Sequence, residues 1–355
     1  MSSPAFQIMD SPIFLGTLSE HLPTWLASRA YHQVFILTDQ HTHEYCLPLL
    51  QSVLPPMEAV YVYCIAAGES EKNLQTCAEI WQAMLEAKLD RNALVLNLGG
   101  GVIGDMGGFC AATWKRGVDF VQIPTTLLAM TDAALGGKTG VDFQGIKNII
   151  GVFKPPAAVF IDPHFLQTLA IRERHSGLAE VIKHAVIGEP FFYQWLLGAY
   201  PTRHAEAAFW LEMLEKSVEV KVRVVTEDPL EKGPRMLLNF GHSIGHALES
   251  WFLSTPQPLT HGEAIFIGML CEAWVSQDER LAERVYALGK NLFPWVEIPP
   301  SAFTALWEAM QQDKKNASGT VRMAVPDESA YTLRLIHPTK SDIKAALARY
   351  QAMEI

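Results

Sequence analysis

The sequence has few cysteines, no excess of positive charge and no long apolar run, and each of these absences argues against a class of protein. Its five cysteines are odd in number and widely spaced, and no C-x-x-C pair occurs. This pattern argues against a disulfide framework and against a cysteine-ligated zinc. It indicates reduced thiols of the kind found in the cytosol.

Charge and hydropathy argue against further classes of protein. The formal net charge of −10 at pH 7 argues against a nucleic-acid-binding surface, which is basic. An anionic ligand would therefore need a local cluster of Lys and Arg. No apolar stretch is long enough to cross a bilayer, and residues 1–7 lack the basic and apolar regions of a secretory signal. We expect a soluble cytoplasmic protein, and 355 residues leave room for two domains.

The first half of the chain alternates short apolar runs with helical patterns. A helix is predicted over residues 72–88, and strands are predicted over residues 34–37, 60–65, 94–98, 120–123 and 158–161. Such alternation predicts a parallel, doubly wound sheet of the Rossmann type. Ligands of these sheets bind beyond the carboxyl ends of the strands.

The stretch from Ala93 to Asp105 organises this half. An apolar run ends in Gly99, Gly101 and Gly104, which fit the spacing G-x-G-x-x-G, and a helix is expected from Val102. Glycine lets a backbone come close to a ligand, and the free N–H groups of a helix N-terminus attract anions. The pattern predicts a dinucleotide site, although a tight strand-to-helix turn is the alternative.

The pattern changes near residue 168, where we place a domain boundary between residues 1–168 and 169–355. The second part is predicted to be α-helical, with a possible terminal hairpin over residues 321–325 and 331–335. Its expected helices are residues 178–186, 209–225, 243–251, 263–275 and 303–311.

Histidines and a carboxylate in this helical part suggest a metal site. His242 and His246 are four residues apart and would share one helix face, and His261 follows in Thr-His-Gly-Glu. Two histidines and a carboxylate with an open position are typical of catalytic zinc. Spacing alone leaves the third ligand open among Glu180, His184, His246 and Glu263.

Cations and one carboxylate complete the candidate chemistry. Lys138 follows two glycines and could present its ammonium group to an anion, and Asp132 could hold a nicotinamide or a hydroxyl, cap a helix or pair with a cation. Further candidate cations are Lys147, Lys183, Lys221, Arg235, Lys314 and Lys315. A dinucleotide, a metal and many cations together indicate oxidation of an alcohol on an anionic substrate.

Over most of its length, the sequence resembles the 3-dehydroquinate synthase family. The resemblance rests on several long motifs in the expected order: Gly-Gly-Gly-Val-Ile-Gly-Asp (99–105), Lys-Arg-Gly-Val (115–118), Ile-Pro-Thr-Thr-Leu-Leu-Ala-Met-Thr-Asp (123–132), Gly-Gly-Lys-Thr-Gly-Val-Asp (136–142), Gly-Leu-Ala-Glu-Val-Ile-Lys (177–183), Leu-Asn-Phe-Gly-His-Ser-Ile-Gly-His (238–246) and His-Gly-Glu (261–263). It implies an α/β, Rossmann-like NAD-binding domain over residues 1–168 and an all-α metal- and substrate-binding domain over residues 169–355.

The resemblance also implies a role for each residue that matches a motif. Zinc or cobalt would be held by Glu180, His242 and His261. The catalytic side chains would be Lys138, Lys183, Lys221, Asn239 and His246. Further substrate contacts would come from Arg116, Asp132, Lys147, Asn148, Arg235, Lys314 and Lys315. NAD would contact Asp39, Glu69, Lys72, Gly100, Gly101, Asp105, Thr125, Thr126, Asp132, Lys138 and Lys147.

The family's reaction converts 3-deoxy-D-arabino-heptulosonate 7-phosphate to 3-dehydroquinate and phosphate in the shikimate pathway. It proceeds by transient oxidation with NAD, phosphate elimination, re-reduction and an intramolecular aldol step. The family is usually dimeric, and Arg116 would reach the partner subunit's site. The alternatives are another sugar-phosphate cyclase, a metal-dependent polyol or glycerol-phosphate dehydrogenase, and a non-catalytic binding protein.

Overall fold

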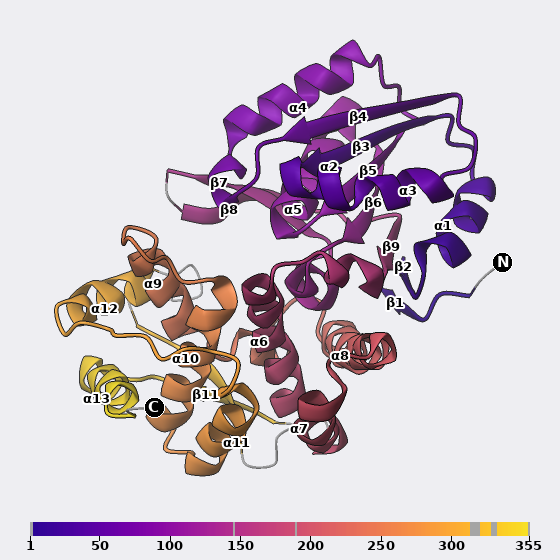
Figure 1. The fold of residues 1–355 in the computed structure, drawn as a ribbon. Coiled ribbons are helices and arrows are strands. Elements are labelled where there is room, and N and C mark those ends of the chain that lie inside the picture. The colour runs from indigo at the N-terminus through magenta and orange to yellow at the C-terminus, as the bar shows by residue number, and fades with distance from the viewer. Residues whose placement is uncertain (1–2, 145, 189, 313–319, 328–331, 354–355) are drawn as a thin grey trace. The chain divides into compact units, whose positions relative to one another are not determined.

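The computed structural model describes residues 3–144, 146–188, 190–312, 320–327 and 332–353. The chain divides into two compact units (Figure 1). Unit 1 comprises residues 1–170 and 210–222, and unit 2 comprises residues 171–209 and 223–355. Helix α8 (Ala207–Glu227) contributes to both units.

Unit 1 is built on a seven-stranded sheet with the order β1-β2-β9-β6-β5-β3-β4. Only β1 pairs antiparallel, with β2, and every other pair in this sheet is parallel. The bounds are β1 Phe6–Ile8, β2 Ser11–Leu15, β3 Gln33–Asp39, β4 Ala59–Ile65, β5 Leu94–Gly99, β6 Asp119–Pro124 and β9 Ala158–Ile161. The parallel sheet predicted from the sequence is confirmed, with β1 and β2 in addition. Both strands are short, and β2 contains Pro12, so their sequences give only a weak indication of a strand.

Helices pack on the sheet and bury its central strand. All six residues of β5 are buried because β3 and β6 flank it, and its side chains face covering layers. Val95 of β5 and Phe120 of β6 pack with Ile80 of α4 and Met106 of α5 in one core cluster. The helical segments are α1 Leu18–Ala27, α2 Gln40–Tyr45, α3 Leu47–Val53, η1 Glu69–Glu71, α4 Leu74–Glu86, α5 Gly101–Thr113, η2 Trp114–Arg116, η3 Ala129–Ala133 and η4 Pro163–Gln167.

Helix α5 lies unusually close to its neighbours because it carries glycine on the contacting face. A Cβ atom at Gly107 would overlap the side chain of Asn97 in β5. A Cβ atom at Gly108 would stand 2.6 Å from the Thr139 side chain. Alanine at either position would push the helix away from the strands that it covers.

A separate antiparallel hairpin joins β7 (Lys138–Phe143) to β8 (Ile146–Phe153). It was not predicted, because Gly140 and Gly151 interrupt both strands and glycine weakens a strand pattern. Their backbones touch: a Cβ atom at Gly140 would lie 2.6 Å from the Ile150 carbonyl oxygen. Gly136 and Gly137, just before β7, have φ values of 108° and 67°, which favour glycine.

Unit 2 is mostly helical, as predicted. The five expected helices lie within α6, α8, α9, α10 and α12. Helices α7, α11 and α13 were not predicted: α7 contains Gly198 and Pro201, and the other two are rich in charge. The bounds are α6 Ile171–Ile187, α7 Pro190–Arg203, η5 Pro234–Asn239, α9 His242–Phe252, α10 His261–Val275, α11 Glu279–Gly289, α12 Ala302–Gln312 and α13 Lys340–Gln351.

The terminal hairpin consists of β10 (Met323–Pro326) and β11 (Leu333–Ile336), which pair antiparallel. The predicted strands began at residues 321 and 331. Residue 331 lies outside the described residues.

Glycines also bring α9 and α10 into direct backbone contact. A Cβ atom at Gly268 of α10 would overlap the carbonyl oxygen of Gly241. A Cβ atom at Gly245 of α9 would lie 2.7 Å from the Ile265 side chain. Gly241 itself has φ 83° and precedes the first residue of α9. Small residues therefore fix the spacing between two helices that each begin with a histidine.

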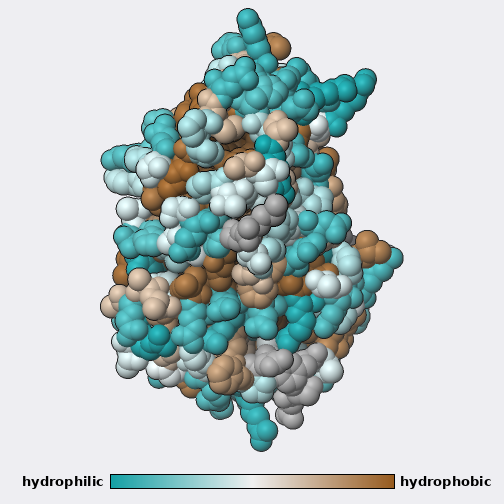
Figure 2. Space-filling view, turned by 90° about the vertical axis from the view of Figure 1, so that its right-hand side faces the viewer, coloured by the Kyte–Doolittle hydropathy of each residue, from teal (hydrophilic) through white to brown (hydrophobic). Residues whose placement is uncertain are grey.

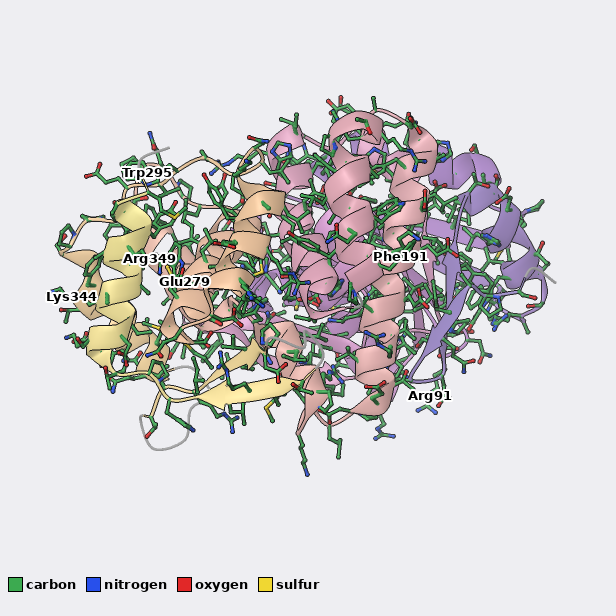
Figure 3. All side chains as sticks on the ribbon, turned by 90° about the horizontal axis from the view of Figure 1, so that it is seen from below. Arg91, Phe191, Glu279, Trp295, Lys344 and Arg349 are labelled. Atoms are coloured by element: carbon green, nitrogen blue, oxygen red, sulfur yellow. The ribbon has the colours of Figure 1, made fainter. Side chains whose placement is uncertain are left out.

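The face of the molecule that Figure 2 shows is mixed in hydropathy. Apolar residues are scattered there among hydrophilic ones. On α13, Arg349 pairs with Glu279 of α11 at 2.6 Å (Figure 3). All five cysteines are free thiols. In the described parts of the chain, no helix combines the length and the apolar character that a bilayer crossing requires.

Candidate active site

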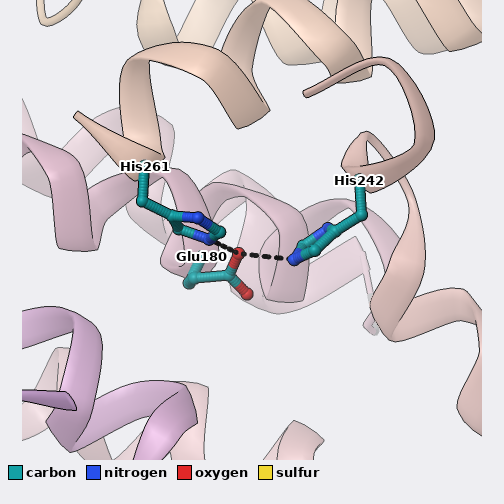
Figure 4. Close-up of side chains that lie close together, drawn as sticks. All are labelled: Glu180, His242 and His261. Atoms are coloured by element: carbon teal, nitrogen blue, oxygen red, sulfur yellow. Dashed lines mark ion pairs between the residues drawn. The ribbon is translucent and has the colours of Figure 1, made fainter. Parts of the chain in front are cut away.

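Three side chains from three helices of unit 2 converge at one point (Figure 4). Glu180 lies within α6, and His242 and His261 are the first residues of α9 and α10. Glu180 Oε1 is 3.7 Å from His242 Nε2 and 3.6 Å from His261 Nε2. The carboxylate therefore lies between the two rings and faces the same nitrogen of each.

The second nitrogen of each ring is engaged elsewhere, which fixes the direction of the first. His242 Nδ1 lies 3.3 Å from the carbonyl oxygen of Phe240, and His261 Nδ1 lies 3.4 Å from Glu249 Oε2. In the tautomer that these partners favour, Nδ1 carries the proton and Nε2 offers a lone pair. Glu180 is fully buried and pairs with Lys183, one helical turn later.

This donor set fits a divalent metal. A carboxylate oxygen and two imidazole nitrogens lie within 4.8 Å of one another. Ligands about 2.1 Å from a tetrahedral ion stand about 3.4 Å apart. The 3.6 and 3.7 Å separations are close to that spacing. Two histidines with one carboxylate also leave a coordination position open, as catalytic sites require.

The other ligand candidates have different surroundings. Glu263 accepts hydrogen bonds from Arg172 at 2.8 Å and from the Thr260 backbone N–H at 2.8 Å, and so serves the start of α10. His184 is buried one turn after Glu180. His246 lies one turn after His242, with ring centres 4.9 Å apart, and forms a second possible ligand group with Glu249 and His261.

Neighbouring carboxylates determine the charge of His261. Burial alone would lower the pKa of His261, but hydrogen bonds to Glu180 and Glu249 raise it to about 9. A metal ion held by Glu180 and His261 would take the place of a proton at Nε2, because a histidine nitrogen that ligates a metal must be deprotonated.

Sequence reasoning missed two buried glutamates beside the histidines, Glu249 of α9 and Glu272 of α10. The Glu249 carboxylate faces His261, and the Glu272 carboxylate accepts backbone N–H groups at the start of α9. The sequence could have pointed to Glu272 because it is a lone carboxylate in an apolar stretch, Met-Leu-Cys-Glu-Ala-Trp.

The other predicted residues of unit 2 lie around η5. Lys183 Nζ donates to the Leu238 carbonyl oxygen at 2.6 Å, and Lys183 is buried. Arg235 is buried, and its Nη1 donates to the Pro229 carbonyl oxygen at 2.8 Å. The Asn239 amide donates to Glu231 Oε1 at 2.7 Å. The predictions for Lys314 and Lys315 fall outside the described residues.

In unit 1, the glycine turn connects β5 to α5 as predicted, and the helix begins at Gly101, one residue earlier than expected. No glycine of the turn has a positive φ, so close packing is what favours glycine here. A Cβ atom at Gly100 would lie 3.0 Å from Thr126 Cγ2, and one at Gly99 would overlap Ile103. The start of α5 borders a narrow hollow lined by Gly100, Gly101 and Gln122.

Ion pairs hold several of the predicted cofactor residues. Lys72 Nζ lies 2.6 Å from Asp105 Oδ2, and Lys147 Nζ lies 3.3 Å from Glu69 Oε1. Burial opposes the charge of Lys72, but Asp105 outweighs it and raises the Lys72 pKa above its usual value. Asp39 ends β3 and caps α2, because its carboxylate accepts the Thr42 N–H at 2.8 Å.

The remaining residues of unit 1 lie in loops and short elements. Asp132 of η3 forms an ion pair with Lys221 of α8, one of the arrangements that the sequence left open. Thr125 donates its N–H to the Gly99 carbonyl oxygen at 3.0 Å. Three predicted residues are exposed: Arg116 in η2, Lys138 at the start of β7 and Asn148 in β8.

Both halves of the chain are similar to known proteins of one family. Sequence models described as 3-dehydroquinate synthase N-terminal and C-terminal match residues 62–176 and 177–316. A 3-dehydroquinate synthase from Parabacteroides distasonis is 40% identical over 314 residues, which cover 87% of this chain and 88% of that protein. One from Xylella fastidiosa is 40% identical over 352 residues, covering 91% and 94%.

Solved structures share the fold more widely. The 2-epi-5-epi-valiolone synthase ValA from Streptomyces hygroscopicus, solved with NAD+ and Zn2+ bound, superposes with a TM-score of 0.86 at 27% identity and covers 100% of both chains. A probable glycerol dehydrogenase from Sinorhizobium meliloti gives a TM-score of 0.63 at 15% identity, covering 99% of this chain and 98% of that one. At that identity the second likeness concerns the fold alone.

Proposed function

The chain belongs to the 3-dehydroquinate synthase family, and from that premise we propose that it converts 3-deoxy-D-arabino-heptulosonate 7-phosphate to 3-dehydroquinate and phosphate. The observation that supports this best is the meeting of Glu180, His242 and His261. These three side chains would together supply the protein ligands of the divalent metal that the proposed reaction requires. The reaction would place the protein in the shikimate pathway, before aromatic amino acids.

The proposed cofactors are NAD+ and Zn2+ or Co2+. Glu180, His242 and His261 would hold the metal. The α5 N-terminus and the residues at the strand ends of unit 1 would hold NAD+, because helix N–H groups suit a pyrophosphate. When bound, the two groups supply reversible hydride removal from a hydroxyl and polarisation of that hydroxyl.

The chain's own side chains would bind the substrate and move protons. Lys183 and Arg235 are buried cations whose charge suits the carboxylate and phosphate of the substrate. His246 lies one turn after His242, and its imidazole could take a proton from the substrate or return one to it. Lys138 and Lys147 would add positive charge from unit 1, and Lys221, paired with Asp132, would add a third cation there.

Further features of the proposal follow from the family. We expect a homodimer in which Arg116 reaches the site of the partner subunit. The protein would act in the cytoplasm. The NAD-binding domain would span residues 1–168 and the metal- and substrate-binding domain residues 169–355.

One assay tests the main proposal against its competitors. Phosphate release from the heptulosonate phosphate should require NAD+ and should stop when a chelator removes the metal. No NADH should accumulate, because the hydride returns to the sugar skeleton after phosphate elimination and before the aldol step. Stoichiometric NADH would instead indicate a polyol or glycerol-phosphate dehydrogenase.

A panel of other sugar phosphates completes the test. Turnover of a different seven-carbon sugar phosphate, and not of the heptulosonate phosphate, would indicate another sugar-phosphate cyclase. A metal-loaded protein that turns over no member of the panel would indicate a binding protein.

A further inference from the structure

Glu272 of α10 holds the start of α9. Its side chain is fully buried and accepts three backbone N–H groups: from Gly241 at 2.8 Å, from Ser243 at 2.9 Å and from Ile244 at 3.1 Å. The first N–H groups of a helix have no partner within the helix, and they favour negative charge. The residues on both sides of His242 are therefore fixed by one carboxylate.

Glu249 of α9 holds the ring at the start of α10. It is buried at 8% exposure, and its Oε2 lies 3.4 Å from His261 Nδ1. That contact directs the other ring nitrogen, Nε2, toward Glu180 at 3.6 Å. A carboxylate behind a histidine commonly fixes the tautomer and orientation of a metal ligand.

The two contacts are reciprocal. Helix α9 carries His242 and Glu249, and helix α10 carries His261 and Glu272. The buried glutamate of each helix therefore acts on the histidine, or the histidine-bearing turn, of the other.

We propose that Glu249 and Glu272 are positioning residues for the metal site, Glu249 orienting the His261 ring and Glu272 anchoring the turn from which His242 projects. This inference rests on the proposed function, because it takes Glu180, His242 and His261 as metal ligands. Two backbones in contact set the distance between the helices, and the two carboxylates set the directions of the ligands.

The experiment measures metal binding in the purified full-length protein after its metal has been removed with a chelator. Zn2+ affinity is obtained by competition with a chelating dye, and the Co2+ form is examined by visible absorption. Glu249→Gln and Glu272→Gln should each weaken Zn2+ binding about 10- to 100-fold, the usual effect of losing an outer-shell partner. Each should also alter the Co2+ spectrum, which reports ligand geometry.

Asp278→Asn is the matched control. Asp278 is another buried carboxylate of unit 2, and it caps α11 by accepting the Leu281 N–H at 2.9 Å. Its loss should lower the melting temperature, while Zn2+ affinity and the Co2+ spectrum stay as in the wild type. If Glu272→Gln is unfolded by circular dichroism, Glu272→Asp replaces it with the same expected loss, since the shorter side chain withdraws the carboxylate.

The outcomes separate this inference from the proposed function. Wild-type Zn2+ affinity and an unchanged Co2+ spectrum in the folded variants would overturn the positioning roles, whatever the activity. A wild-type protein that binds one Zn2+ but releases no phosphate would contradict the proposed function alone. A wild-type protein that binds no metal would contradict both.

Discussion

The two units bring their candidate functional residues together in different ways. In unit 1 several of these residues follow strands: Asp39 ends β3, Gly99 ends β5, and Thr125 follows β6. In unit 2 two of the three candidate metal ligands begin helices, His242 in α9 and His261 in α10, whereas Glu180 lies within α6. Parallel pairing aligns the ends of neighbouring strands, whereas helices must first pack against one another, here partly through glycine contacts.

This contrast predicts where substitutions do most harm. In unit 2, if Glu180, His242 and His261 hold a metal as proposed, the loss of one of them should remove metal binding and turnover together. In unit 1, the ion pairs also stabilise the fold, so that damage should appear first as lost stability.

His242→Ala should abolish metal binding and turnover. We expect kcat to fall more than about 100-fold, the upper range for losing only a partner of a ligand. Metal content and phosphate release measure the two effects. His246→Ala, one turn away, is the comparison: it should retain the metal and lose turnover. Stoichiometric zinc in the His242→Ala protein would refute its assignment as a ligand.

Lys72→Met should destabilise unit 1. Asp105 would lose the ammonium group at 2.6 Å and remain as a poorly compensated, partly buried charge, which costs about 1–3 kcal/mol. Denaturant unfolding measures the change, and the KM for NAD+ should rise if Lys72 also contacts the cofactor. Lys344→Met is the control, because Lys344 is exposed on α13 (Figure 3). Equal stabilities of the two variants would contradict the role of the pair.

Arg235→Ala and Lys138→Ala test whether these two cations bind the carboxylate and phosphate groups of the substrate. Each should lower kcat/KM about 10- to 100-fold, since a hydrogen bond to a charged group is worth about 1.5–3 kcal/mol. Steady-state kinetics with the heptulosonate phosphate measure the loss. Lys154→Ala, a half-buried lysine just after the β7–β8 hairpin that no motif assigns to the site, should leave kinetics near those of the wild type. Near-normal kinetics at Arg235 or Lys138 would count against that assignment.

His175 should give the smallest effect, on stability between pH 7 and pH 5. Burial lowers the pKa of His175 below 6.5, even though a hydrogen bond to the Leu292 backbone opposes this. The unfolded chain then binds more protons than the folded chain below pH 6.5, so stability falls as the pH falls through that window.

His175→Gln should reduce this pH dependence, by at most about 2 °C in melting temperature. Thermal scans at pH 7 and pH 5 measure it, with His337→Gln as an exposed control. Parallel curves for wild type and His175→Gln would show that His175 does not contribute.

Much of the fold could be predicted from local patterns. The apolar run of β5 and the glycines after it placed the central strand and the start of α5 within a residue. Short strands with proline or glycine were missed, as were amphipathic helices rich in charge, because their local signal is weak. Parallel pairing then followed from the alternation of elements.

The candidate site could be predicted only in part. The spacing of His242 and His246 indicated a shared helix face, but it could not choose Glu180 as the carboxylate partner, because α6 is far from α9 in the chain. The same distance hid Glu249 and Glu272, whose partners lie on another helix. The pairing of Asp132 with Lys221 is likewise set by packing and not by sequence spacing.

The backbone contact between α9 and α10 has a consequence for redesign of this site. Gly241, Gly245 and Gly268 touch no candidate ligand atom, yet a single methyl group at any of them would push the helices apart. A library that seeks new substrates by changing side chains must therefore leave these three glycines unchanged, since they set the distance between the helices that begin with His242 and His261.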